Sequence, residues 1–111
     1  MPGAAFSYLF TMTHTVFFWL RADLSADDRA AFETGLRSLL GIPGATRAVI
    51  GRPAATPKRE VIDDTYDWAL ELDFPTLADQ DVYQAHPTHV AFVEAHRSKW
   101  DRVRVYDFEW A

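Results

Sequence analysis

Residues 13–20, THTVFFWL, constrain the fold more than any other segment of this chain, because both of their alternating sets of side chains are mostly apolar. β-branched and aromatic residues favour a strand, and a strand that is apolar on both faces is usually covered on both. His14 shares one face with Val16, Phe18 and Leu20. The segment therefore predicts a strand in a sheet that has protein packed on each side.

Two helical regions are predicted between strand-like segments. Ser25 followed by Asp28 is an N-cap signal, and Gly41 is a typical helix stop. Apolar residues recur at helical spacing between these signals: Phe32, Leu36, Leu39 and Leu40. A second N-cap signal at Thr76 begins another helix, and Pro87, which fits the first turn of a helix, restarts helical geometry up to about Trp100.

Three further strands complete the pattern, at residues 46–51, 66–74 and 103–108. In 66–74, YDWALELDF, every second side chain from Tyr66 onwards is large and apolar, as in a half-buried strand. The order strand, helix, strand, strand, helix, strand is typical of an α+β, ferredoxin-like βαββαβ protomer with helices on one face of the sheet. The other, apolar face would then be exposed, and exposed apolar faces usually mark interfaces. We expect a face-to-face homodimer.

The composition excludes several classes of function. A net charge of −5 argues against nucleic acid and anionic membranes as partners. The chain has no cysteine, so disulfides, thiolate metal sites and cysteine nucleophiles are excluded. We expect a cytoplasmic protein in which residues 1–12 are a leader or tail, residues 13–111 are one domain, and residues 52–64 are a long exposed loop that is a candidate lid.

Residues 83–89, YQAHPTH, gather groups that can move protons around a helix-starting proline. His89 is a candidate general base, and Tyr83 is a candidate hydrogen-bond donor beside it. The alternative for each is a buried side chain that only satisfies a structural hydrogen bond. His86 is expected to cap the helix that begins at Pro87. His14 either faces an apolar cavity or lies at the surface.

Other polar and aromatic residues favour structural roles. A zinc site needs three or four protein ligands, so the spacing of His86, His89 and His96 does not predict a metal site. His96 is instead expected on a solvated helix end with Arg97 and Lys99. Asp67 and Asp107 are expected to form hydrogen bonds at a sheet edge or interface. Trp68, Phe92 and Trp100 are typical of a core.

Several short motifs resemble one known family over residues 13–108. The motifs are His14 within THTV, the turn 42–44 (IPG), Tyr83 with the HPTH element at 86–89, Trp100, and the terminal VYDF at 105–108. Together they are similar to the stress-responsive A/B barrel, or Dabb, family. The resemblance implies a ferredoxin-like protomer whose sheets pair in a homodimer to form a dimeric α+β barrel.

The resemblance also implies a site. A plant polyketide cyclase of the family performs aldol chemistry without a cofactor, using the tyrosine before this element and its second histidine, which match Tyr83 and His89; the first-strand histidine matches His14. We therefore expect these three as catalytic residues, no cofactor and no metal. The expected pocket-lining residues are Val16, Phe18, Phe32 and Trp100. Two departures set this chain apart, namely Gly35 in place of a pocket aromatic and a longer loop before the third strand.

Two functions of different kinds follow. The first is cofactor-independent acid/base chemistry, such as an aldol, cyclisation or tautomerisation step, on a small carbonyl or polyketide-like compound with an apolar or aromatic body. The second is a non-catalytic dimer that binds a small molecule or has a structural, stress-related role. A cofactor-free oxygenase, known among related dimeric barrels, is a third option that no residue here selects.

Overall fold

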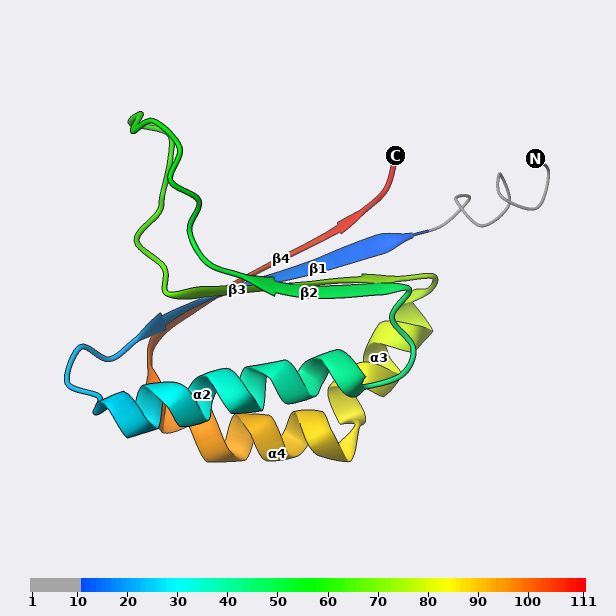
Figure 1. The fold of residues 1–111 in the computed structure, drawn as a ribbon. Coiled ribbons are helices and arrows are strands. Elements are labelled where there is room, and N and C mark those ends of the chain that lie inside the picture. Colours follow the sequence, from blue (N-terminus) through cyan, green and yellow to red (C-terminus); the bar gives the residue numbers. More distant parts are fainter. Residues whose placement is uncertain (1–10) are drawn as a thin grey trace.

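A computed structural model describes residues 11–111 of the chain (Figure 1). One four-stranded antiparallel sheet has the order β2-β3-β1-β4. Its strands are β1 (Met12–Leu20), β2 (Arg47–Gly51), β3 (Trp68–Phe74) and β4 (Trp100–Glu109). The α-helices are α2 (Ala26–Ser38), α3 (Leu77–Ala85) and α4 (Pro87–His96), with short 3₁₀ helices η1 (Leu39–Gly41) and η2 (Arg97–Lys99). The ferredoxin-like α+β prediction is confirmed, with its second helix divided into α3 and α4.

The helix starts follow the local signals in the sequence. Ser25 Oγ accepts a hydrogen bond from the Asp28 backbone N–H at 3.0 Å, which caps α2. Thr76 Oγ1 does the same for Asp79 at 3.1 Å, which caps α3. Each cap satisfies a backbone donor that the first helical turn leaves free. Together they fix where α2 and α3 leave the sheet.

Helices α2, α3 and α4 lie against one face of the sheet, and that face carries the core (Figure 1). Alternate residues of β1 point into this layer, from Met12 to Leu20. Phe18 contacts Phe32 of α2 and Phe92 of α4, with ring centroids 5.3 and 6.1 Å apart. The residues predicted to share one face of the first strand therefore face the helices. They are His14, Val16, Phe18 and Leu20.

The opposite face of the sheet bears no helix in the part of the chain that the structure describes (Figure 1). The sequence predicts an apolar face, but the observed face is only partly apolar. One end is charged, where Arg47 forms ion pairs with Glu71 and Asp73. The other end is aromatic. We call this surface the open face.

Tyr66 belongs to the open face, which corrects the register predicted for residues 66–74. β3 begins only at Trp68, so the alternation does not extend back to Tyr66. The Tyr66 ring instead lies 4.8 Å from Phe17 and 6.3 Å from Trp19 between ring centroids. The backbone bends at Asp67, where a carboxylate oxygen accepts from the Leu20 N–H at 2.7 Å.

His96 corrects a second expectation, since it is 8% exposed rather than part of a solvated helix end. Its ring packs against Phe32 and Phe92 at 5.8 and 5.2 Å between centroids. Gly35 on α2 makes this possible, because a Cβ there would lie 2.3 Å from His96 Nε2. The imidazole thus fills the space that a side chain at position 35 would take.

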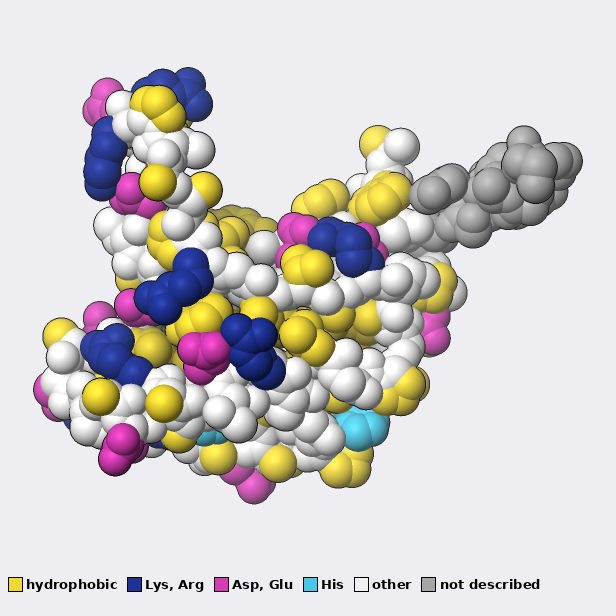
Figure 2. Space-filling model, in the orientation of Figure 1, with side chains coloured by type: hydrophobic (Ala, Val, Ile, Leu, Met, Phe, Trp, Pro, Cys, Tyr) yellow, Lys and Arg dark blue, Asp and Glu magenta, His cyan; other side chains and the backbone are white. Residues whose placement is uncertain are grey.

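The long segment between β2 and β3 projects away from the helices (Figure 1). We call residues 53–65 the arm. In Figure 2 the arm stands clear of the body and carries basic and acidic side chains next to each other. Lys58 and Asp64 of the arm form an ion pair at 3.0 Å. Because the arm points away from the helical layer, it does not cover the space between helices and sheet. The lid expectation therefore does not hold for that space.

Met12, expected to end the N-terminal tail, lies in the sheet. Met12 is the first residue of β1 and is 2% exposed, and the Thr11 carbonyl accepts from the Trp110 N–H at 2.8 Å. The remainder of the expected leader, residues 1–10, lies outside the described residues. Within residues 11–111, no helix combines the length and the hydropathy needed to cross a membrane.

Candidate functional site

A cavity of about 160 Å³ lies between the sheet and the helices. Strand β1 supplies His14, Val16 and Phe18, while α3 and α4 supply Tyr83 and His89. The remaining wall is almost entirely apolar: Leu39, Leu70, Gln84, Phe92, Val93, Trp100, Val103 and Val105. The three side chains expected to be catalytic therefore share one apolar cavity, although they come from three different elements.

The junction between α3 and α4 brings Tyr83 and His89 together. His86 is the N-cap of α4, and its Nδ1 accepts from the Thr88 backbone N–H at 3.1 Å, so its predicted capping role is confirmed. Pro87 takes the first helical position. The chain consequently turns between the last turn of α3 and the first turn of α4, and the rings of Tyr83 and His89 lie 5.0 Å apart between centroids.

Tyr83 is fully buried, and its hydroxyl is one of two buried side-chain polar atoms in residues 11–111 without a hydrogen-bond partner. Its ring packs on Phe74 at 5.3 Å and on His14 at 6.3 Å. Burial raises the pKa of the Tyr83 phenol above its ordinary value. The hydroxyl therefore stays protonated, and no group in residues 11–111 accepts its hydrogen bond.

His14 is 4% exposed, so the surface alternative for this residue is excluded. Its Nδ1 lies 2.5 Å from Oδ1 of Asp107, its cross-strand partner on β4. A carboxylate only accepts hydrogen bonds, which assigns the proton to Nδ1 and leaves the Nε2 lone pair unused by this contact. Asp107 lies on the edge strand β4 and forms a hydrogen bond there, as expected, and its partner is the imidazole of His14.

His89 lies on the first turn of α4 and is half-buried. Burial lowers the pKa of His89 below its ordinary value, and a positive charge on His14 would lower it further, while the Gln84 backbone opposes both effects. His89 is thus mainly neutral at pH 7, the form that accepts a proton. His14, Tyr83 and His89 together place two imidazoles and one phenol in one cavity.

The cavity opens to solvent beside Gln84 and Val105. Gln84 is exposed, and Val105 is 48% exposed, yet both line the cavity. The Asp107 side chain is also 49% exposed, next to His14. The exposed side of the cavity is therefore the side next to β4, while Tyr83 itself stays fully buried.

The expected pocket residues divide into two groups. Val16, Phe18 and Trp100 line the cavity, whereas Phe32 lies one layer behind it, packed between Phe18 and Phe92. Sequence periodicity marks Phe32 as inward-facing but does not reveal that another ring stands in front of it. The sequence analysis assigned Asp107 a hydrogen bond but not its partner, because the register that places it opposite His14 follows only from strand pairing.

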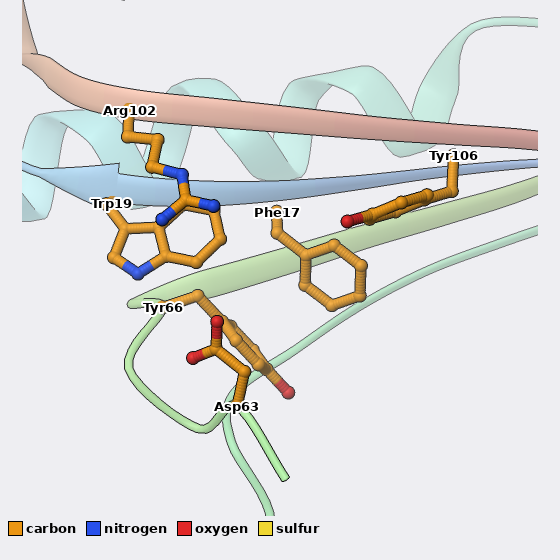
Figure 3. Close-up of a pocket in the computed structure, with 6 residues that line it drawn as sticks. All are labelled: Phe17, Trp19, Asp63, Tyr66, Arg102 and Tyr106. Carbon is orange, nitrogen blue, oxygen red and sulfur yellow. The ribbon is translucent and has the colours of Figure 1, made fainter. Parts of the chain in front are cut away.

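A second hollow of about 110 Å³ lies on the open face (Figure 3). Phe17, Trp19, Tyr66 and Tyr106 form its aromatic part, and the Arg102 guanidinium stacks 4.4 Å from the Trp19 ring centroid. No imidazole lines it. In residues 11–111, no three metal-binding side chains come close enough to hold a metal ion, at this hollow or elsewhere.

Comparison with known proteins gives a family and a fold. The family model described as the stress responsive A/B barrel domain matches residues 12–110. A Dabb family protein with a ferredoxin-like fold from Mesorhizobium loti has 25% identity and a TM-score of 0.70, with 89% of this chain and 95% of that chain covered. No curated protein matches the chain.

Two further solved structures share the fold at lower identity. A dimeric ferredoxin-like protein of unknown function from Thermobifida fusca has 20% identity and a TM-score of 0.72, covering 91% of this chain and 92% of its own. A hydroxynitrile lyase from Passiflora edulis has 19% identity and a TM-score of 0.75, covering 91% and 94%. At these identities the likeness shows the fold.

Proposed function

Since the chain belongs to the stress-responsive A/B barrel domain family, we propose that it is a cofactor-independent acid/base enzyme acting on a small carbonyl compound. The reaction would begin with removal of a proton from the carbon next to the carbonyl group. Tautomerisation, aldol addition and cyclisation all share this step. The family and fold allow many activities, so the residues of the site decide between them.

One observation carries the proposal: a buried phenol without a hydrogen-bond partner shares an apolar cavity with two imidazoles. Buried polar groups in folded proteins are nearly always paired. A structural tyrosine would be expected to find a partner within the protein. An unpaired Tyr83 hydroxyl beside His89 is better explained as a group reserved for a ligand.

The proposed step assigns each group a role. The neutral His89 ring takes the proton from the α-carbon, and the electron pair left behind moves onto the carbonyl oxygen. The Tyr83 O–H donates a hydrogen bond to that oxygen, where negative charge develops, and donors placed there are among the largest contributors to catalysis. His14, oriented by Asp107, assists by holding or returning a proton.

The cavity limits the size of the substrate. A void of roughly 150 Å³ holds a molecule of the size of benzene, and the cavity has a similar volume of about 160 Å³. A compound with one ring or a short chain fits, whereas an extended polyketide chain would have to protrude through the mouth. The substrate class therefore narrows to small carbonyl compounds with an apolar body.

The same proposal includes a homodimer formed through the open face. Phe17 and Trp19 lie on this face near Tyr106, which is 59% exposed, and Phe108, 54% exposed, lies farther along β4 opposite Thr13. Exposed aromatic patches usually mark interaction sites. The dimeric description of the Thermobifida fusca protein of the same fold supports this assignment.

Exchange of α-protons tests the chemistry without knowledge of the natural substrate. Acetophenone is incubated with the protein in D₂O, and loss of its methyl proton signal is followed by NMR. Wild-type protein should accelerate exchange, and His89→Ala should abolish the acceleration. His86→Asn is the matched control, since asparagine also caps helices and His86 does not line the cavity.

The control should exchange acetophenone at the wild-type rate. If neither acetophenone nor other small ketones and aldehydes exchange faster with wild-type protein than without it, the non-catalytic binding dimer is the better account.

A further inference from the structure

Two buried donors in the described part of the chain have no hydrogen-bond partner, the Tyr83 hydroxyl and the indole N–H of Trp100. The proposed reaction uses the first and leaves the second unexplained. Both side chains line the same cavity. Two unpaired buried donors on side chains that line one cavity are an unusual arrangement in a folded protein, and they point to a ligand that carries two acceptors.

The rings that carry the two donors pack beside different residues of β1. Tyr83 packs against His14 at 6.3 Å, and Trp100 packs against Phe18 at 5.7 Å between ring centroids. His14 and Phe18 are four residues apart on β1, which is about 13 Å along a strand. A ligand that meets both donors must therefore be elongated.

The ends also differ in chemistry. His14 and His89 accompany Tyr83 at one end, so proton transfer is confined there. At the other end, the neighbours of the Trp100 ring are Phe18 and Phe92, with centroids 5.7 and 6.2 Å away. The indole N–H is thus a single polar group among apolar walls, an arrangement that fixes orientation and specificity in small-molecule sites.

We propose that the cavity selects small carbonyl compounds with a second hydrogen-bond acceptor at the end remote from the carbonyl group. The carbonyl oxygen accepts from Tyr83 O–H, and the remote acceptor accepts from Trp100 Nε1–H. Trp100 is then the specificity-determining residue of the site. That the carbonyl end of the ligand is the end that reacts rests on the proposed function. The preference for ligands with two acceptors does not.

Acetophenone and 4-acetylpyridine form a matched pair of probes. They have nearly the same shape, and the ring nitrogen of 4-acetylpyridine is an acceptor opposite the ketone. In NMR titrations of ¹⁵N-labelled protein, 4-acetylpyridine should bind about fivefold more tightly, the effect of one net hydrogen bond. The Trp100 indole N–H resonance should move downfield with 4-acetylpyridine only.

Trp100→Phe keeps an aromatic ring but removes the donor, and it should abolish the preference for 4-acetylpyridine. Trp19→Phe is the matched control: it makes the same change at a tryptophan whose Nε1–H donates to Thr65 Oγ1 at 2.8 Å, outside the cavity. This variant should keep the preference.

Equal affinity of wild-type protein for the two probes, a preference that survives Trp100→Phe, or no binding of either probe at millimolar concentration would overturn the inference. The result is separable from the test of chemistry, because only binding is measured. A clear preference without α-proton exchange would contradict the proposed reaction and leave the two-acceptor site standing.

Discussion

At the scale of single residues, the sequence locates the candidate site better than it describes the contacts there. Tyr83 and His89 are recognisable because a helix-starting proline stands between them. The sequence does not show that Asp107 orients His14, since that contact depends on strand pairing between residues 93 positions apart. Nor does it show that His96 is buried against Gly35, because a histidine near a helix end also suits a solvated position.

The pH dependence of α-proton exchange should report His89. Burial lowers the pKa of His89, so the active neutral form should persist to a pH below its ordinary pKa of about 6.5, and the rate should fall only under more acidic conditions. Burial raises the pKa of Tyr83, so no alkaline decline from this group is expected up to about pH 10. A pH–rate profile measures both limbs. An acidic limb centred above pH 7 would contradict the assignment of His89 as base.

Gly35→Ala should destabilise the protein by about 1–3 kcal/mol, the usual cost of forcing extra atoms into a packed site. The added Cβ would lie 2.3 Å from His96 Nε2. Urea unfolding measures the loss. Gly41→Ala is the control, because a Cβ there meets nothing within 4 Å. An unchanged stability of Gly35→Ala would show that His96 is not held against α2.

At the scale of helices and strands, local signals are reliable where the chemistry is local. Both N-caps form as expected, since each needs only residues three positions apart. The alternation of apolar side chains predicts that β3 starts at Tyr66, two residues too early. It cannot show the bend at Asp67, because that bend involves a hydrogen bond from Leu20 of another strand. The division of the second helical region at Pro87 was foreseen for the same local reason as the caps.

Thr76→Ala should lower stability by about 1 kcal/mol, because it removes the cap of the helix that carries Tyr83. Thr76→Ser keeps a hydroxyl acceptor and should stay close to wild type. Thermal unfolding of the three proteins compares them. Equal melting temperatures for Thr76→Ala and wild type would mean that the cap does not stabilise α3.

At the scale of the whole molecule, the flat protomer leaves one sheet face without helices (Figure 1). The order of strands and helices in the sequence predicts that one face of the sheet bears no helix. Its division into a charged end and an aromatic end was not anticipated, because each strand contributes only alternate residues and the register between strands decides which of them meet. The arm between β2 and β3 rises on the same side (Figure 2).

A dimer of this 12.6 kDa chain should appear in light scattering at micromolar concentration, with twice the mass of the protomer. Tyr106→Arg should shift it toward the monomer, because a charge would be buried in the aromatic part of the open face. Val82→Arg, at a 64% exposed position on α3, is the control and should remain dimeric. A monomeric wild-type protein would contradict the interface.

The central claim is that Tyr83 serves a ligand rather than the fold, and Tyr83→Phe tests it most directly. Because the hydroxyl has no hydrogen-bond partner, its removal should leave the melting temperature unchanged or raise it, while acetophenone exchange should slow by about 10²-fold or more. The measurement is the exchange rate and the melting temperature of the same sample. A lower melting temperature together with unchanged exchange would contradict the account.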